Sequence, residues 1–121
     1  LLPRTCLGNR SAEMQAILDS TEGDLRVCYD VNHITLYEGA RESLNALGDR
    51  IVTLHISDHD GIDERHWIPG KGIIDWPDFM AGLDDIGYRG CLMHEARDKE
   101  LDLPGNLTEI AEAARRHLAW S

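Results

Sequence analysis

The sequence has few cysteines and no long apolar run. Its three cysteines (Cys6, Cys28 and Cys91) form neither a CxxC pair nor an even set, so a disulfide framework or a structural zinc knuckle is not expected. No apolar stretch approaches the roughly 18 residues that a membrane-spanning helix needs. The first residues also lack the basic-then-apolar order of a secretory signal. We therefore expect a soluble, cytoplasmic protein with no membrane partner.

Basic residues are also scarce. Twelve Lys and Arg residues stand against 22 Asp and Glu residues, which gives a formal net charge of -10. A surface that binds nucleic acid by neutralising its phosphates is therefore not expected, and a small polar or cationic partner fits better. The length of 121 residues and the 42% of hydrophobic residues are typical of one domain with its own core.

Helical and strand-like segments alternate along the chain. Apolar residues at spacings of three and four predict helices, and short apolar or β-branched runs predict buried strands. The expected helices cover residues 11–21, 37–47, 75–86 and 106–120, and the expected strands cover residues 25–30, 51–56 and 91–95. Strands separated by helices predict an α/β fold with a parallel sheet and right-handed crossovers.

Local signals mark the ends of the helices. Ser11 and Asn106 are the expected N-caps of the first and last helices. Pro77 belongs in the first turn of the third helix, where its missing N–H costs nothing. The last helix is expected to bury one stripe of residues, namely Ile110, Ala114 and Leu118.

Each expected strand ends in a residue type that binds metals. Asp30 precedes His33, His55 precedes Asp58, and Glu95 ends the third strand. A single Asp after a strand is most often a cap, and a single His is most often a satisfied polar residue. Three such residues at the same edge of a parallel sheet instead favour a metal site. Carboxylate and imidazole ligands suit a divalent Mn, Mg, Co or Zn ion.

Two further histidines have structural interpretations. His94 neighbours Glu95 on a strand, so we expect it to point to the opposite side, toward the helices. His117 lies near the end of the last helix, where a cation is favoured by the helix dipole. Neither histidine is expected to take part in chemistry.

The loop after the second expected strand, residues 57–72, is polar and contains several glycines. Such loops often carry function. Gly70 and Gly72 resemble a turn that binds phosphate, but a simple turn from the loop into the next helix is the favoured interpretation. His59 and Asp60 are expected to be solvated.

The order of these motifs resembles that of a known family. Residues 30–33 (DVNH) resemble a D-x-x-H motif, residues 55–58 (HISD) an H-x-x-D motif, and residues 66–76 an H-x-x-PG-x-G-x-IDW run. A GY-x-G motif at residues 87–90 and Glu95 follow. Together they are similar to the xylose isomerase-like TIM-barrel superfamily, which includes sugar and sugar-phosphate isomerases and epimerases, inosose dehydratase and endonuclease IV.

The resemblance implies that residues 1–121 form a single partial domain, the C-terminal part of a TIM barrel with approximately strands 5–8 and their helices. The chain begins at Leu1 rather than at Met, so we expect a fragment of a longer protein. Residues 2–4 resemble the end of the family's E-N-L-P segment. The resemblance therefore places a fourth metal ligand, a Glu, directly before Leu1.

The resemblance also implies a function. Asp30, His55 and Glu95 would bind a divalent metal, and Glu95 would also be the catalytic acid or base. The reaction would be proton transfer next to a carbonyl, through an enediolate, in a small carbohydrate. The implied substrate-binding residues are His33, Glu64, Arg65 and His66.

Two alternatives remain open. In endonuclease IV-like zinc phosphodiesterases, His33 and His66 would be metal ligands, although Glu64 stands where that pattern has Asp. The second alternative is an inactive half-barrel that self-associates as a homo-oligomer through unpaired edge strands. Incision of abasic-site DNA would support the first alternative, and metal binding without sugar turnover would support the second.

Overall fold

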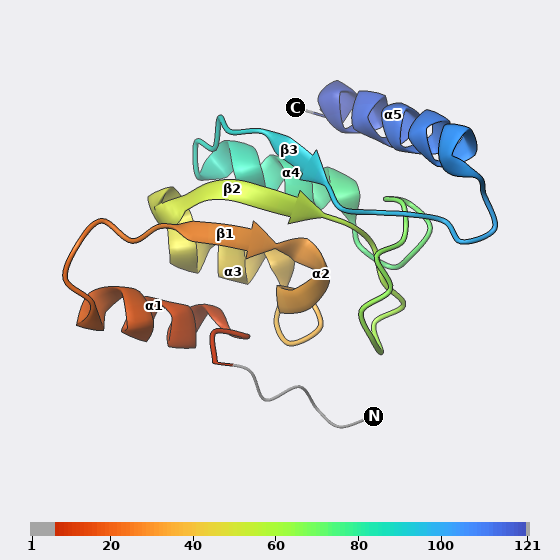
Figure 1. Cartoon of the computed structure of the whole chain (residues 1–121). Coiled ribbons are helices and arrows are strands. Elements are labelled where there is room, and N and C mark those ends of the chain that lie inside the picture. Colours follow the sequence, from red (N-terminus) through yellow and green to blue (C-terminus); the bar gives the residue numbers. More distant parts are fainter. Residues whose placement is uncertain (1–6, 121) are drawn as a thin grey trace.

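The structure is a computed structural model that describes residues 7–120, so the predicted similarity of residues 2–4 to a family segment lies outside the described part. Three strands, β1 (Val27–Asp30), β2 (Ile51–Ile56) and β3 (Leu92–His94), form one sheet in the order β1-β2-β3. Both pairs are parallel, which confirms the predicted α/β class with parallel (β/α) units. The helices are α1 (Ser11–Ser20), α2 (Val31–Ile34), α3 (Ala40–Leu47), α4 (Trp76–Asp85) and α5 (Leu103–Trp120), and a 3-10 turn, η1 (Gly48–Arg50), leads into β2 (Figure 1).

Helices α3 and α4 pack on one face of the sheet and enclose the core. Leu54 and Ile56 of β2 are fully buried there, beside Leu44 of α3 and Phe79 of α4. Tyr29 of β1 packs at 6.2 Å from the Phe79 ring. Burial alternates along β1, and along β2 from Thr53 onward, with the period of two of a strand; before Thr53 the register of the two strands shifts.

The opposite face of the sheet carries different side chains. Val52 and Met93 are half exposed there, at 52% and 50%, and Cys28 is exposed as a free thiol. In a closed barrel this face lines the interior. Asp30 and His55 are register partners at the carboxyl ends of β1 and β2, so they share this edge.

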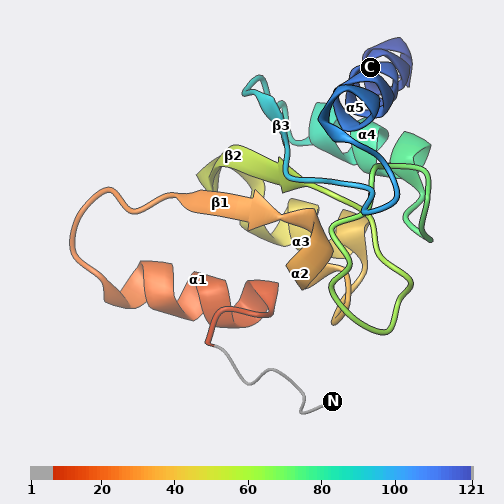
Figure 2. The ribbon, with the colours of Figure 1, turned by 45° about the vertical axis from the view of Figure 1, so that its right-hand side comes forward.

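The N-terminal helix begins where predicted, but its cap differs. Arg10 occupies the N-cap position and makes no side-chain capping bond. Ser11 is already helical, and its N–H and hydroxyl donate to the Glu38 carboxylate at 2.6 and 3.0 Å. The prediction of Ser11 as N-cap is therefore wrong, because a distant carboxylate replaces the local cap. In Figures 1 and 2, α1 lies beneath β1, away from β3.

The middle helices are close to the predicted ones. The second predicted helix starts at Ala40 rather than at residue 37, and the short helix α2 was not predicted. The start of α4 is as predicted: the Asp75 side chain accepts the Asp78 N–H at 3.1 Å, and Pro77 lies in the first turn.

The last helix begins three residues earlier than predicted. Asp102 accepts the Gly105 N–H at 2.9 Å, so it holds the first turn in place of Asn106. The predicted stripe is also partly wrong, because Leu118 is 68% exposed while Ala113 is fully buried. Within the described residues, no helix is both long and apolar enough to cross a membrane.

Candidate metal centre

Asp30, His55 and Glu95, the first cluster, converge at the carboxyl edge of the sheet. Each offers one ligand atom, and these atoms all lie within 4.8 Å of one another. The His55 Nδ1 atom is 3.5 Å from Asp30 Oδ2 and 2.9 Å from Glu95 Oε2. Glu95 comes directly after β3, and its N–H donates to the Ile56 carbonyl at 3.0 Å, so it stays in line with the sheet.

The Asp30 carboxylate has a divided role. Its Oδ1 atom accepts the N–H groups of Asn32 and His33, at 3.0 and 3.3 Å, and thereby caps α2. Its Oδ2 atom faces His55 and lies 3.6 Å from His33 Nε2. The ordinary capping interpretation and the metal-ligand interpretation are therefore compatible, because one oxygen serves each.

The first cluster is open to solvent on one side. The Asp30 side chain is 21% exposed, His55 is 35% exposed and Glu95 is 54% exposed. Nearby, partial desolvation and the negative charges of Asp30 and Glu95 raise the pKa of the Cys28 thiol. The thiol therefore stays protonated and is not a ready metal ligand.

Asp58 has a structural part in the 57–72 loop. It is fully buried, and its carboxylate accepts hydrogen bonds from Gly70 N at 2.9 Å, Ile74 N at 3.2 Å and the Trp76 Nε1 at 2.9 Å. Its backbone also pairs with that of Trp67. Asp58 therefore organises the loop and does not reach the first cluster.

His59 is not solvated, contrary to the prediction, and its exposure is 1%. Its Nδ1 accepts the Gly61 N–H at 2.9 Å, so its Nε2 carries the proton and donates to the Thr35 hydroxyl at 2.6 Å. The hydroxyl in turn donates to the Val31 carbonyl. Burial lowers the pKa of His59, which keeps this ring neutral.

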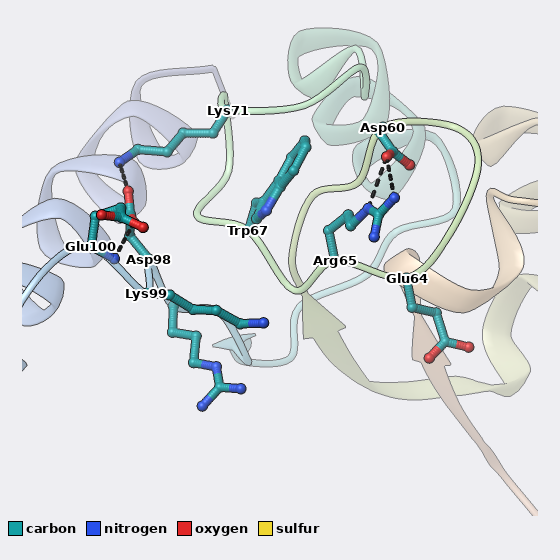
Figure 3. Close-up of a pocket in the computed structure, with 9 residues that line it drawn as sticks. Asp60, Glu64, Arg65, Trp67, Lys71, Asp98, Lys99 and Glu100 are labelled. Atoms are coloured by element: carbon teal, nitrogen blue, oxygen red, sulfur yellow. Dashed lines mark hydrogen bonds and ion pairs between the residues drawn. The ribbon is translucent and has the colours of Figure 1, made fainter.

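Arg65 is engaged by neighbouring carboxylates. Its Nε and Nη2 atoms lie 2.8 and 2.7 Å from Asp60 Oδ2 (Figure 3), and Nη1 lies 3.8 Å from Asp63. The hydrogen bond from Arg65 lowers the pKa of Asp60 well below its usual range. Asp60, predicted to be solvated, is 25% exposed and also holds the guanidinium in place.

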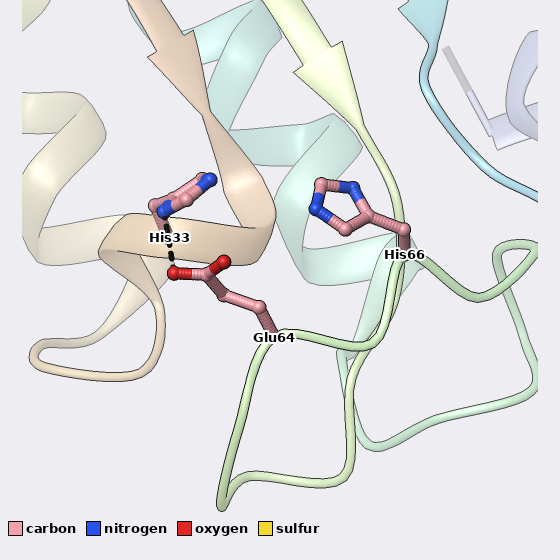
Figure 4. Close-up of side chains that lie close together, drawn as sticks. All are labelled: His33, Glu64 and His66. Atoms are coloured by element: carbon pink, nitrogen blue, oxygen red, sulfur yellow. Dashed lines mark ion pairs between the residues drawn. The ribbon is translucent and has the colours of Figure 1, made fainter. Parts of the chain in front are cut away.

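His33, Glu64 and His66 form a second cluster (Figure 4). His33 Nδ1 lies 2.9 Å from Glu64 Oε1, and the rings of the two histidines are 6.1 Å apart. Because His33 Nε2 also faces Asp30, this ring connects the two clusters. The structure thus brings together three of the four predicted substrate-binding residues.

The backbone at His66 is strained. Its φ of 52° is in the left-handed region, which costs non-glycine residues roughly 1–3 kcal/mol. The conformation is fixed by its neighbours, since the His66 carbonyl accepts the Arg97 N–H at 2.8 Å. The ring Nδ1 lies 3.3 Å from the Glu95 carbonyl oxygen.

His94 and His117 lie on the helix side of the sheet, away from both clusters. Their rings stack at 5.3 Å, and His117 also stacks on Trp76 at 4.8 Å. The orientation predicted for His94 is thus confirmed. His117 is only 1% exposed, so the predicted role as a cation at the helix end is wrong: burial lowers its pKa to about 4.

A pocket of about 480 Å³ adjoins the second cluster. Glu64 and Arg65 form one wall, and Arg97 and Lys99, from the segment after β3, belong to its lining. No role was predicted for Arg97 or Lys99 from the sequence. Their position directly after the carboxyl end of a strand was the signal that could have identified them.

The chemistry of the first cluster fits a divalent ion. Two carboxylates and one imidazole present separate ligand atoms to a common point, and this mixed oxygen and nitrogen set is the kind that Mn, Mg, Co and Zn prefer. The backbone bonds to Asp30 Oδ1 orient the ligand from behind, as outer contacts do in metal sites.

Comparison with family models identifies one family. A family model described as "Xylose isomerase-like TIM barrel" matches residues 2–120. Inosose dehydratase of Erwinia tasmaniensis is 27% identical over 128 residues, which cover 88% of this chain and 42% of that protein. Fructoselysine 3-epimerase of Escherichia coli is 43% identical over 44 residues, which cover 36% of this chain and 16% of that protein.

The fold has the same relatives. A crystal structure of a D-tagatose 3-epimerase-like protein superposes on this chain with a TM-score of 0.80 at 20% identity. The superposed region covers 98% of this chain and 43% of that structure. The chain therefore spans less than half the length of these proteins.

Proposed function

The chain belongs to the xylose isomerase-like TIM-barrel family, and we propose that it carries the C-terminal part of a metal-dependent sugar or sugar-phosphate isomerase or epimerase. The observation behind this proposal is the convergence of Asp30, His55 and Glu95 from three parallel strands. We assign residues 1–121 to approximately strands 5–8 of the barrel. The small-molecule carbohydrate substrate follows from the similarity to sugar epimerases.

We assign metal binding to Asp30, His55 and Glu95. A divalent ion held there would polarise a substrate carbonyl, a contribution of several kcal/mol to the stabilisation of developing charge. Asp30 Oδ2 and His55 Nδ1 already face each other at 3.5 Å. Because the backbone fixes Asp30, this ligand needs little reorganisation.

Glu95 is also the proposed catalytic acid or base. Its Oε2 atom faces His55 at 2.9 Å, which leaves Oε1 to take the proton from the carbon next to the carbonyl. Return of that proton by Glu95 to the former carbonyl carbon would give isomerisation, whereas epimerisation would require a second acid on the opposite face of the enediolate to protonate the original carbon. The exposure of Glu95 gives a substrate access to this oxygen.

His33, Glu64, Arg65 and His66 are the proposed substrate-binding residues. His33 and Glu64 orient each other, with His33 Nδ1 at 2.9 Å from Glu64 Oε1, and together they would present polar groups to a substrate hydroxyl. Arg65 commits two nitrogens to Asp60, and its Nη1, 3.8 Å from Asp63, would bind a substrate oxygen. Free thiols at Cys28 and Cys91 support a cytoplasmic location, which we also propose.

The proposal is tested by manganese titration and by proton exchange. Calorimetry of the chain should detect one Mn²⁺ site that His55→Ala removes. NMR in D₂O should show solvent deuterium entering the carbon next to the carbonyl of D-fructose or D-tagatose when the protein containing this chain acts on it. Glu95→Gln should abolish the exchange, whereas Glu112→Gln, which changes an exposed carboxylate on α5, should not. No bound metal, or exchange unaffected by Glu95→Gln, would overturn the proposal.

A zinc phosphodiesterase is the second candidate, and the second cluster favours it. Two histidines and a carboxylate there would suit an additional zinc ion. The net charge of -10 argues against a DNA substrate. Incision of an abasic-site duplex by the zinc-loaded protein would establish this activity, and intact duplex together with sugar turnover would exclude it.

The third candidate is an inactive half-barrel that self-associates. It is favoured by the exposure of Val52 and Met93 on the inner face of the sheet and by the edge strands β1 and β3. Sedimentation velocity over a range of concentrations is the direct test. A homo-oligomer that binds metal without turnover would support this candidate, whereas a monomer at all concentrations would exclude it.

A further inference from the structure

The pocket beside the second cluster contains both kinds of charge. Its volume of about 480 Å³ is within the range of small-molecule sites. It lies between the 57–72 loop and the segment after β3 (Figure 3). Its lining residues are Asp60, Glu64, Arg65, Trp67, Lys71, Arg97, Asp98, Lys99 and Glu100.

Most of these charges are already paired. Asp60 forms an ion pair with Arg65 at 2.7 Å, and Asp98 forms one with Lys71 at the same distance. The hydrogen bond between Lys71 and Asp98 raises the pKa of Lys71 and lowers that of Asp98. Glu64 is held by His33. All three pairs border the pocket, and the Asp60–Arg65 and Asp98–Lys71 pairs contribute little net charge to it.

Two cations in the lining are not neutralised. Among the described residues, the side chains of Arg97 and Lys99 make no hydrogen bond or ion pair, whereas the lining carboxylates Asp60 and Asp98 are each paired with an Arg or Lys side chain. The chain has a net charge of -10, so it contains many acidic side chains that could pair with Arg97 and Lys99. Leaving both cations unpaired in one pocket is therefore a feature that suits an anion.

The pocket adjoins the second cluster, which His33 connects to the candidate metal centre through Asp30. Glu64 belongs both to the pocket and to the second cluster. Arg97 follows Glu95 by two residues, and its N–H holds the His66 carbonyl at 2.8 Å. In Figure 3, Lys99 extends toward the loop that carries Arg65 and Trp67. A ligand with one end at Glu95 therefore has its other end within reach of these cations.

We propose that Arg97 and Lys99 bind an anionic group, a phosphate or a carboxylate, at the end of the carbohydrate that is remote from the reacting carbonyl. Arg97 supplies a planar guanidinium that pairs with such oxygens through two parallel bonds, and Lys99 supplies a point charge. Trp67 provides an apolar wall for the carbon chain between them. The anion site itself does not depend on the proposed function. Only the statement that the rest of the ligand is a carbohydrate with a reacting carbonyl rests on that function.

The test measures anion binding to the metal-free chain, so that it is independent of catalysis. Inorganic phosphate, gluconate and the neutral polyol glucitol are titrated at constant ionic strength and followed by amide chemical shifts in NMR. We expect phosphate or gluconate to shift residues 65–67 and 97–100, and the tighter of the two identifies the anionic group. The double variant Arg97→Met and Lys99→Met should weaken that binding about tenfold or more.

A matched control distinguishes anion binding in the pocket from non-specific attraction of anions to exposed cations. Arg115→Met removes an exposed cation from α5 and should leave the anion affinity unchanged. Equal affinity for glucitol, shifts outside the pocket or unchanged binding by the double variant would overturn the assignment. Manganese titration of the same proteins reports separately on the metal centre, so failure of the proposed function and failure of the anion site give different results.

Discussion

Asp30 and His55 are direct partners in the parallel register of β1 and β2, and His55 Nδ1 lies 3.5 Å from Asp30 Oδ2. The sheet itself therefore sets the spacing of two proposed ligands. Glu95 reaches the same point because its N–H continues the pairing of β3 with β2. The pairing register of the strands therefore sets the position of the first cluster, and no surface loop is needed to bring its three side chains together.

Asp30→Asn should separate metal binding from capping. An Asn side chain still accepts the backbone N–H groups of Asn32 and His33, so α2 stays capped, but the charged ligand atom is lost. We expect Mn²⁺ affinity to fall roughly tenfold or more, measured by calorimetry, with little change in the unfolding midpoint without metal. Asp49→Asn, an exposed carboxylate on η1, is the control. Equal Mn²⁺ affinities in the two variants would remove Asp30 from the ligand set.

Asp58→Ala should destabilise the loop and α4 together. The change leaves the N–H groups of Gly70, Ile74 and the Trp76 indole without their acceptor, and each unsatisfied buried donor costs about 1–3 kcal/mol. We expect a loss of about 3–5 kcal/mol in urea unfolding and a shift of tryptophan fluorescence toward solvent-exposed values. Asp63→Ala, in the same loop but without these bonds, should cost far less. Similar losses for both variants would contradict the assigned role.

Gly72→Ala should also be costly, for steric reasons. A Cβ atom there would overlap the Asp58 carboxylate and the His59 carbonyl, both of which are buried and fixed. We expect a loss of about 2–3 kcal/mol in urea unfolding. Gly39→Ala is the matched control, because Gly39 has a φ of -64° and its added Cβ would make only an ordinary contact. The prediction fails if the two variants unfold at the same urea concentration.

The sequence predicted the strands better than the buried polar groups. The run at 51–56 matches β2 residue for residue, because a β-branched apolar run between turn signals has one reasonable interpretation. Asp30, His55 and Glu95 were identifiable because parallel strands place their ends together. The burial of His59 could not be predicted from the sequence, because it depends on a hydroxyl from a different part of the chain, that of Thr35.

Errors at the helix ends have a local cause. Asn106 looked like an N-cap, but its side chain accepts the Asp98 N–H and donates to nearby carbonyls instead. Asp102 with Pro104 two residues later was the stronger start signal. Leu118 was assigned to the buried stripe because spacing gives a period but not its phase, and only the packing of α5 against α4 and the loop decides which face is inside.

His117 predicts how the stability of the protein depends on pH. Burial, together with the positive charges of His94 and Arg116, lowers its pKa to about 4, while Asp58 acts in the opposite direction. An unfolded His titrates near pH 6.5, so the unfolded chain takes up the proton at a higher pH than the folded chain does. Stability should therefore be full above pH 6.5, fall as the pH drops toward 4, and level off below. This one ring contributes at most about 3 kcal/mol.

The measurement is urea unfolding between pH 7.5 and pH 4, together with an NMR titration of the His117 ring. His117→Gln removes the group, so part of the pH dependence should disappear; the remainder belongs to His59 and His94, whose pKa values are also lowered by burial. His33→Gln, which changes a partly exposed ring, is the control. If the His117 ring titrates near pH 6.5 in the folded protein, its burial between Trp76 and His94 does not impose the neutral form, and the stability profile must have another origin.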